Sequence, residues 1–488
     1  MRFLLTAEHV LAHGAGGHRL LRDAAVVVHG EHIEWVGPQS AAPSDTDERI
    51  NLGSSLLMPG LIDLDALSDI DHLILDSWWD AGHSARLRWS SEHFHAGRRH
   101  ALSPAERKTM RRYALAQLAL HGITTFMPIA SEVHSEWAES HDDFTDVAEV
   151  AMELGLRGFL GPSYRSGVHA TTADGTHAIE FDDEEGRRGF ADAVRFLDTL
   201  QEMDSPLLSG VLMPCRIETV REDLLAETAR VAAERDVLVR VHALQGLSER
   251  ELILREKGIT PLELLQRTGL LSRRLIIAHG IFLDIHGGVH GEDRGDLATL
   301  AAAGASIVHC PLTNTRYASH LQKLSRYLDA GVNISLGTDS FPPDLIRGID
   351  AGVHVAQEQH GDLSAHLLAE YVNAATLGGA KALRRPDLGR IEVGAAADLA
   401  AFALDDFRAG PVEDPIRSLI LSGTGRDTRL TMVAGRVVSR DGTIPGVDLE
   451  ELRREGQTVF DALRAGYAER DHRGGTLDEL FPPVFPLG

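Results

Sequence analysis

Short apolar runs alternate with longer amphipathic segments through the middle of this chain, and this alternation constrains the fold more than any other feature. Between residues 58 and 389, apolar runs such as 122–129, 236–244 and 332–340 each follow a segment with apolar residues at i, i+3 and i+4. Strands that alternate with helices form βαβ units and a parallel sheet. About eight such units fit an α/β fold of the distorted (β/α)8 barrel type, although periodicity alone leaves a doubly wound sheet open.

The two ends of the chain have a different pattern. Residues 1–57 and 390–445 contain β-branched runs separated by glycine turns, which is typical of short antiparallel strands. We expect these two segments to pair into one small β-sandwich domain beside a barrel of residues 58–389. Residues 446–488 predict an outer amphipathic helix followed by an extended tail. The polar, acidic segment 172–190 predicts a loop insertion.

Charge and composition exclude several classes of function. The chain has 72 acidic and 48 basic residues and a formal charge of −24, which opposes binding to nucleic acid or to anionic membranes. Cys215 and Cys310 are the only cysteines, too few for a disulfide framework or a Cys-rich zinc site. Neither a signal peptide nor an apolar window of about 20 residues is recognisable. We therefore expect a cytoplasmic protein with a small-molecule partner.

Polar residues follow five of the apolar runs. The carboxyl ends of barrel strands face a common mouth, where the chemistry of such folds takes place. One such residue alone has an ordinary explanation, as a core histidine or an Asp that caps a helix. Their recurrence at successive strand ends favours a metal site, since imidazole and carboxylate are ligands for Zn²⁺, Mn²⁺ or Fe²⁺. The residues in question are Asp63, Asp65, His242, Gln245, His279, His309, Cys310, Asn314, Thr338, Asp339 and Ser340.

Five fragments, in this order and spacing, resemble the amidohydrolase superfamily: MPGLID (58–63), VRVHALQ (239–245), AHGIFLD (278–284), HCPLTN (309–314) and LGTDS (336–340). The chain is most similar to the cytosine deaminase and chlorohydrolase branch, and within it to the phenylurea and molinate hydrolase group. The likeness covers roughly residues 1–445. It implies the distorted barrel with a β-sandwich satellite, hydrolysis that depends on one divalent metal ion per chain, and a homo-oligomer. Zinc is the first choice of metal, with manganese, iron or cobalt as alternatives.

The resemblance also implies roles for individual residues. His242 matches the metal-binding His after the fifth strand, and Asp339 matches the Asp after the eighth, which binds metal and takes a proton from water. His279 matches the His after the sixth strand, which binds metal or orients water and substrate. In the family's two-metal members, a carbamylated lysine bridges the two ions. No Lys ends the run 207–215 here, so the resemblance implies a site for a single metal ion. The expected substrate-binding residues are Gln245, Asn314 and Ser340.

Two positions depart from the family pattern. The family's His-x-His reads Asp65-Ala66-Leu67, and the Glu that many members carry three residues after the strand-five His is Gln245. Asp65 is the expected replacement ligand. The alternatives are Asp69, Asp71 or His72, the pair His93 and His95, or no ligand from this region. Because Gln cannot titrate, ring deamination is the part of the family's repertoire that we expect least.

The expected function is therefore a metal-dependent hydrolase that cleaves a carbonyl C–N bond of an amide, urea or carbamate. Asp339 and His279 are the expected catalytic residues, and His242, His279, Asp339 and Asp65 the expected metal ligands. Two alternatives remain. One is an aminohydrolase, like a deaminase or chlorohydrolase, that acts on a heterocycle. The other is a metal-free pseudoenzyme of the same fold.

Overall fold

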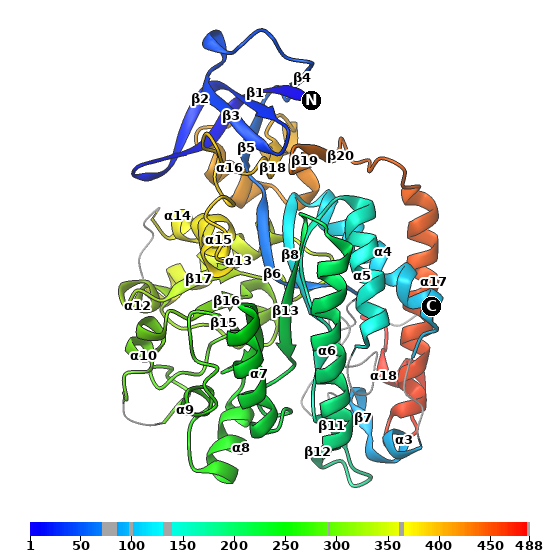
Figure 1. Cartoon of the computed structure of the whole chain (residues 1–488). Coiled ribbons are helices and arrows are strands. Elements are labelled where there is room, and N and C mark those ends of the chain that lie inside the picture. The colour runs from blue at the N-terminus through cyan, green and yellow to red at the C-terminus, as the bar shows by residue number, and fades with distance from the viewer. Residues whose placement is uncertain (71–84, 97–100, 130–138, 291–292, 361–365, 486–488) are drawn as a thin grey trace.

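Eight parallel strands form the central sheet of the protein (Figure 1). The structure is a computed structural model that describes residues 1–70, 85–96, 101–129, 139–290, 293–360 and 366–485. Neighbouring strands follow the order β6, β8, β9, β13, β14, β15, β16 and β17, and the short β10 (Ser163–Tyr164) pairs with β13. Their bounds are β6 (Leu61–Leu67), β8 (Ile123–Ile129), β9 (Arg157–Leu160), β13 (Leu208–Pro214), β14 (Leu238–Ala243), β15 (Leu275–His279), β16 (Ser306–His309) and β17 (Asn333–Leu336).

The first and last strands of this order meet. The backbone N–H of Asp339, just after β17, donates a hydrogen bond of 2.8 Å to the carbonyl oxygen of Asp65 in β6. The sheet is therefore a nearly closed barrel, which confirms the distorted (β/α)8 prediction and excludes the doubly wound alternative. The helices between successive strands are α4 (Pro104–Leu120), α5 (His141–Leu154), α6 (Asp183–Met203), α7 (Glu222–Arg235), α8 (Leu247–Lys257), α9 (Pro261–Arg267), α10 (Asp296–Ala303), α11 (Pro311–Arg316) and α12 (Leu324–Asp329). After β17 come α13 (Leu345–His360), α14 (His366–Asn373) and α15 (Gly379–Ala382).

Local signals in the sequence set several helix ends. Ser103 accepts a hydrogen bond from the N–H of Glu106, and the Glu106 side chain accepts one from Ser103, so α4 begins with a capping box. Gly155 ends α5 with a left-handed φ of 78°, which glycine adopts without steric cost.

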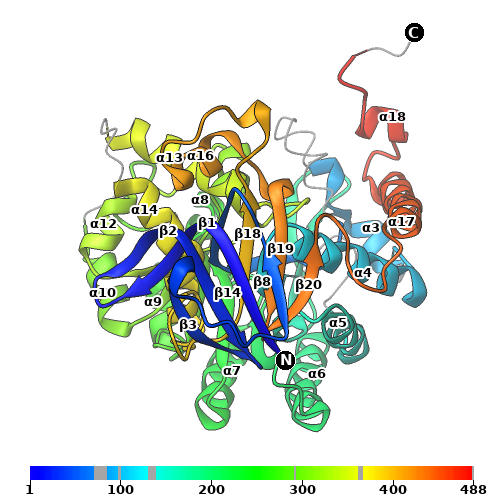
Figure 2. The same cartoon turned by 90° about the horizontal axis from the view of Figure 1, so that it is seen from above.

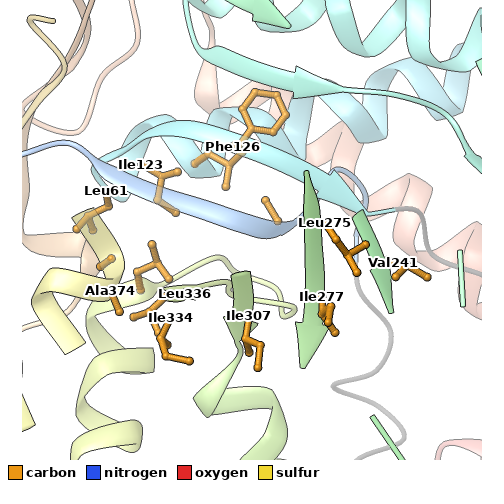
Figure 3. Close-up of a cluster of buried hydrophobic side chains, with 14 of the residues drawn as sticks. Leu61, Ile123, Phe126, Val241, Leu275, Ile277, Ile307, Ile334, Leu336 and Ala374 are labelled. Carbon is orange, nitrogen blue, oxygen red and sulfur yellow. The ribbon is translucent and has the colours of Figure 1, made fainter. Parts of the chain in front are cut away.

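The barrel strands are apolar on the side that faces the helices. Figure 3 shows part of this buried cluster, including Phe126, Val241, Ile277, Ile307 and Ile334. In an extended strand, successive side chains point to opposite faces. Because Val241 faces outward in β14, its neighbours Arg240 and His242 face the interior of the barrel. The alternation therefore directs two polar side chains of one strand toward the site.

A second sheet combines strands from both ends of the chain. Its order is β20, β19, β18, β5, β1, β2 and β3, and β4 also pairs with β1. It lies at the top of Figure 1 and is seen from above in Figure 2. β5 leads into the barrel strand β6, so the second sheet adjoins the amino end of the barrel, away from the carboxyl ends of the strands. The strands are β1 (Arg2–Gly14), β2 (Gly17–His29), β3 (His32–Pro38), β4 (Glu48–Asn51), β5 (Ser55–Pro59), β18 (Leu399–Ala403), β19 (Thr428–Val433) and β20 (Arg436–Arg440).

Pairing of the two ends, as the sequence predicts, is thus part of the confirmed fold. The proposed domain boundaries remain a prediction, and β5 extends across the one drawn between residues 57 and 58. The helix expected in the tail is α17 (Leu449–Arg470), which packs against α4, and the short α18 (Leu477–Leu480) follows. In the part of the chain that the structure describes, no helix has the length and apolar character to cross a membrane.

The segment 172–190 is not the loop that its polar composition predicts. It contains β12 (His177–Phe181), which forms a hairpin with β11 (Gly167–Thr171), and the start of α6. β11 also pairs with β7 (Trp89–Ser90), which is followed by α3 (Ser91–His95). β12 is missed because it is only five residues long, is partly exposed and follows directly on turn and acidic residues, whereas its partner β11 is largely buried.

Candidate metal centre

Four buried side chains from four barrel strands converge at the carboxyl end of the barrel. Asp65 lies in β6, His279 ends β15, Cys310 directly follows β16, and Asp339 follows β17. One possible ligand atom from each residue lies within 4.8 Å of all the others. Carboxylate, imidazole and thiol groups are donors that suit a divalent transition-metal ion such as zinc. This donor set agrees with the expected cofactor, a divalent metal with zinc as first choice.

Asp65 lies at the centre of the group. Its Oδ2 atom is 4.0 Å from Nε2 of His279 and 3.5 Å from Sγ of Cys310. Oδ2 of Asp339 is 3.9 Å from the same nitrogen of His279. His242 is not a member of this compact group, but its Nε2 atom is 3.7 Å from Oδ1 of Asp65. Three of the four ligands expected from the sequence, Asp65, His279 and Asp339, therefore belong to the compact group. The fourth, His242, lies beside Asp65.

The two histidines have ring nitrogens available for a ligand. Nδ1 of His242 is 2.9 Å from the carbonyl oxygen of Cys215; it must donate in this bond, so Nε2 of the neutral ring keeps its lone pair. Within the described ranges, neither ring nitrogen of His279 has a hydrogen-bond partner, although this side chain is fully buried. A buried polar group without a partner is costly, and metal coordination would satisfy it.

Burial controls protonation in this group. It lowers the pKa of His279 to about 3, and the positive charge of Arg216 acts in the same direction. Burial, together with Arg240 and Arg216, also lowers the pKa of His242 well below its usual value. Both rings are therefore neutral at pH 7, the form that binds a metal. Burial and the nearby carboxylate of Asp65 raise the pKa of the Cys310 thiol, so a thiolate at this position needs a compensating cation.

Unusual backbone geometry turns two of the ligand candidates inward. Leu275 and Ile277 of β15 pack on the outer side of the barrel, so strict alternation would place His279 there as well. His279 instead has a φ of 76°, which ends the extended conformation and lets its ring lie beside Asp65. Asp339 has a φ of 40°. Left-handed backbone at non-glycine residues is uncommon and concentrates at functional sites.

Gly337 lets β17 approach β6 closely at the site. A Cβ atom on Gly337 would lie 2.5 Å from Cβ of Asp65, far inside van der Waals contact. The small residue in the LGTDS fragment is therefore needed for Asp65 and Asp339 to share one site.

Arg240 is a feature of the site that the sequence analysis did not identify. Its guanidinium donates to Oδ1 of Asp65, and the side chains of Arg240 and Asp65 are 2% and 0% exposed. Burial raises the pKa of Asp65 while Arg240 opposes that rise. The available signal was a charged residue inside the apolar run 238–243, two positions before His242 and so on the same face of the strand.

Asp63 has a structural role next to the site. Its carboxylate accepts hydrogen bonds from the hydroxyl of Thr338 at 2.6 Å and from the N–H of Thr338 at 3.0 Å. It also accepts one from the N–H of Asp65 at 3.1 Å. Burial raises the pKa of Asp63 to about 6. These bonds join β6 to the loop that carries Asp339, and so fix the distance between the two carboxylates.

The other ligand candidates of the opening motif lie elsewhere or are not described. Asp69 is buried, with Oδ2 at 3.7 Å from the Arg111 guanidinium, and is not a member of the donor group. His93 and His95 lie on α3, and His95 is exposed with Nε2 at 3.6 Å from Glu180. Asp71 and His72 are outside the described residues. Among the candidates in the described residues, Asp65 is the one that lies beside the other possible ligands.

The residues expected to bind substrate are placed as follows. Gln245 follows β14, and its Oε1 accepts a hydrogen bond from the guanidinium of Arg216. Asn314 lies in α11 and Ser340 directly follows Asp339; both are buried. Across the described part of the chain, Nδ2 of Asn314 and Oγ of Ser340 make no hydrogen bond of good geometry, and the Asn314 side chain lies near enough to the His279 ring to oppose the lowering of its pKa.

Comparison with known proteins identifies the family. The amidohydrolase family model matches residues 56–438. A 5-methylthioadenosine/S-adenosylhomocysteine deaminase of Halobacterium salinarum is 30% identical over 93% of this chain and 98% of its own. Among solved structures, an adenosine deaminase of Xanthomonas campestris with bound zinc has a TM-score of 0.74 at 24% identity and covers 95% of this chain and 98% of its own. Atrazine chlorohydrolase TrzN of Arthrobacter aurescens, complexed with zinc, has a TM-score of 0.73 at 22% identity, covering 94% and 99%.

The family match spans the whole barrel and part of the second sheet, and the Halobacterium relative matches nearly the full chain. The barrel and the buried donor group agree with this assignment. The chain belongs to the amidohydrolase family and is a hydrolase that acts on carbon–nitrogen bonds other than peptide bonds.

Proposed function

We propose that this protein is a metal-dependent aminohydrolase that removes an amino group from a nitrogen heterocycle. The observation that carries the proposal is the buried group of Asp65, His279, Cys310 and Asp339 at the carboxyl end of the barrel. Relatives and structural neighbours named as deaminases of adenine-containing compounds support this substrate class over the amide, urea or carbamate expected from the sequence. The proposal replaces that first expectation with its stated alternative.

Four residues would hold the metal: Asp65, His242, His279 and Asp339. The unpartnered nitrogens of His279 and the free Nε2 of His242 fit this role. A bound divalent metal would supply a Lewis acid that lowers the pKa of water towards about 7. The assignment rests on the chemistry of the four side chains and on their available ring nitrogens, and not on any single distance.

The protein's own side chains would then move protons and position the substrate. Asp339 takes a proton from the attacking water and delivers it to the leaving amine, since its carboxylate lies beside His279 and the other donors. His279 orients the water. Gln245, Asn314 and Ser340 hydrogen-bond the ring and fix its orientation, because each offers a polar side chain next to a metal-site residue.

A second candidate is hydrolysis of an amide, urea or carbamate, as in the phenylurea and molinate hydrolase group. Gln245 favours it: this side chain cannot carry a proton to a ring nitrogen, and its oxygen is already bonded to Arg216. In the first proposal, Asp339 must therefore carry every proton that the reaction moves, including one to the ring nitrogen. The two candidates differ in whether the substrate carries an exocyclic amine on a ring or a carbonyl C–N bond.

The test combines metal analysis with ammonia release. Protein purified without a metal-affinity tag should contain about one divalent metal per chain. It should release ammonia from one or more of adenosine, 5-methylthioadenosine, S-adenosylhomocysteine and other amino-substituted rings. Asp65→Ala should lose metal, and Asp339→Asn should lower kcat by about 10²- to 10⁴-fold with an unchanged circular dichroism spectrum. Asp329→Asn, an exposed residue at the end of α12, is the matched control.

Three outcomes would contradict the proposal. Turnover of amides or ureas without turnover of any amino-heterocycle would favour the second candidate. Full activity of Asp339→Asn would show that Asp339 does not carry the proton. A wild-type protein that neither contains nor takes up zinc, manganese or cobalt would favour the metal-free pseudoenzyme. Cytoplasmic location and homo-oligomeric assembly remain predictions from the sequence.

A further inference from the structure

Cys310 lies where a metal ligand would lie. It follows β16, the strand between those that carry His279 and Asp339. Its side chain is fully buried, and its Sγ atom is 3.5 Å from Oδ2 of Asp65. Alternation along β16 places it on the inner side of the barrel with Val308, while Ile307 faces outward. A thiol in this position can reach any ion that Asp65, His279 and Asp339 bind, since the four donors lie within 4.8 Å of one another.

We propose that Cys310 is a thiolate ligand of the metal ion, in addition to Asp65, His242, His279 and Asp339. The inference rests on the proposed metal dependence and goes beyond the residues that the family resemblance assigns. Ion binding would form a metal–sulfur bond and release the thiol proton to solvent, with no change of oxidation state.

The charges of the site balance with a thiolate present. Asp65, Asp339, the neighbouring Asp63 and a Cys310 thiolate contribute four negative charges. A divalent metal ion contributes two positive charges, and Arg240, paired with Asp65, and Arg216, whose charge acts on Asp65 and His279, contribute one each. Uncompensated charge in a buried site is expensive, so a neutral set is the arrangement that a closed interior tolerates. This balance explains the inner-facing Arg240: its positive charge compensates for the carboxylate of Asp65, which stands where the family has a neutral histidine.

A thiolate ligand also predicts which metal is preferred. Sulfur is a soft donor that favours zinc and cobalt over magnesium and manganese. The site should therefore retain zinc or cobalt in competition with an excess of manganese. A site that contains only carboxylate and imidazole donors would discriminate less strongly between zinc or cobalt and manganese.

Cobalt(II) gives a direct readout, because a cobalt–thiolate bond produces a sulfur-to-metal charge-transfer absorption in the near ultraviolet. The chain has only two cysteines, and Cys215 is outside the donor group, so Cys215→Ser is the matched control. We expect the absorption in cobalt-loaded wild type and Cys215→Ser, and its loss in Cys310→Ser. X-ray absorption of the zinc-loaded wild type should show a sulfur neighbour at about 2.3 Å, a measurement that needs no variant to fold.

The possible failures are distinguishable. Cobalt that binds one per chain without charge-transfer absorption, or zinc with only nitrogen and oxygen neighbours, would overturn the role of Cys310 and leave the proposed metal site intact. Absorption that persists in Cys310→Ser and disappears in Cys215→Ser would overturn it as well. Failure of the wild type to bind cobalt or zinc would overturn this inference together with the metal dependence of the proposed function.

Discussion

Replacement of Arg240 by Met tests how charge is balanced in the centre of the barrel. Arg240 and Asp65 form an ion pair in which both side chains are almost completely buried, 2% and 0% exposed. Met has a similar length and no charge, so Arg240→Met leaves the buried carboxylate of Asp65 without its ion-pair partner. Removal of one partner of a buried ion pair typically costs about 3–5 kcal/mol, because the remaining charge is uncompensated. We expect a loss of this size in the free energy of unfolding of the metal-free protein.

The loss should depend on metal and on Asp65. A divalent ion bound to Asp65 replaces the missing positive charge, so the loss should be smaller in the zinc-loaded protein. The double variant with Asp65→Asn and Arg240→Met has neither charge and should recover much of the stability that Arg240→Met loses, which gives a coupling energy in a double-mutant cycle.

Guanidinium denaturation, followed by fluorescence and by circular dichroism with and without chelator, measures these differences. Arg112→Met is the matched control, since Arg112 pairs with Glu153 at 2.7 Å but the two side chains are 36% and 49% exposed. An exposed pair contributes little because water screens it. A loss below about 1 kcal/mol for Arg240→Met without metal, no larger than that of the control, would refute the charge argument. Equal losses in the free energy of unfolding with and without zinc would show that the Arg240–Asp65 pair stabilises the protein independently of the bound metal.

Three further predictions concern single positions. Gly337→Ala should weaken zinc binding and lower stability by about 1–3 kcal/mol, because the added methyl would lie 2.5 Å from Cβ of Asp65; unchanged zinc affinity by competitive titration would contradict the close approach of β17. Burial lowers the pKa of His309 to about 3. Below about pH 6.5 the unfolded chain takes up a proton that the folded chain does not, so the free energy of unfolding decreases as pH falls. Between pH 7 and pH 5 this residue alone should account for about 2 kcal/mol, and His309→Gln should remove that difference in chelator-treated protein; an identical pH dependence in both proteins would show that His309 is protonated in the native state. Gln245→Glu should raise deamination of an amino-heterocycle about 10²-fold and leave amide or urea hydrolysis unchanged, because a carboxyl can carry a proton to the ring; faster amide hydrolysis would favour the second candidate function.

Much of the site could be read from the sequence, but not its full composition. His242, His279 and Asp339 end apolar runs, and parallel strands bring such residues to one edge whatever the exact twist of the sheet. Asp65 was selected over Asp69 and over His93 and His95 by position alone, and the structure places only Asp65 among the other donors. The substrate class remains a proposal: the absence of a titratable residue at position 245 favours a carbonyl C–N bond, and relatives named as deaminases favour an amino-substituted ring.

Arg240 and Cys310 show where such reasoning ends. Each has an ordinary explanation along the chain, as a charge in a strand or a small buried residue. Their significance arises from a distance to Asp65, which is separated from them by 175 and 245 residues. Hydrophobic periodicity predicts which face of a strand a residue occupies. It does not predict which residue of another strand lies opposite.

The sequence by itself determined the barrel, the pairing of the two chain ends and the strand ends that carry polar residues, because hydrophobic periodicity and turn residues act over a few neighbouring positions. It missed β12 of the hairpin β11–β12, a short and partly exposed strand whose pairing with the buried β11 cannot be predicted from its neighbours along the chain. Only the tertiary structure decided that Asp65 is paired with Arg240, that Cys310 joins the ligand candidates, and that His279 turns inward at a left-handed residue. These depend on barrel closure, which fixes the distances between strands remote in sequence and so decides which charges must compensate one another.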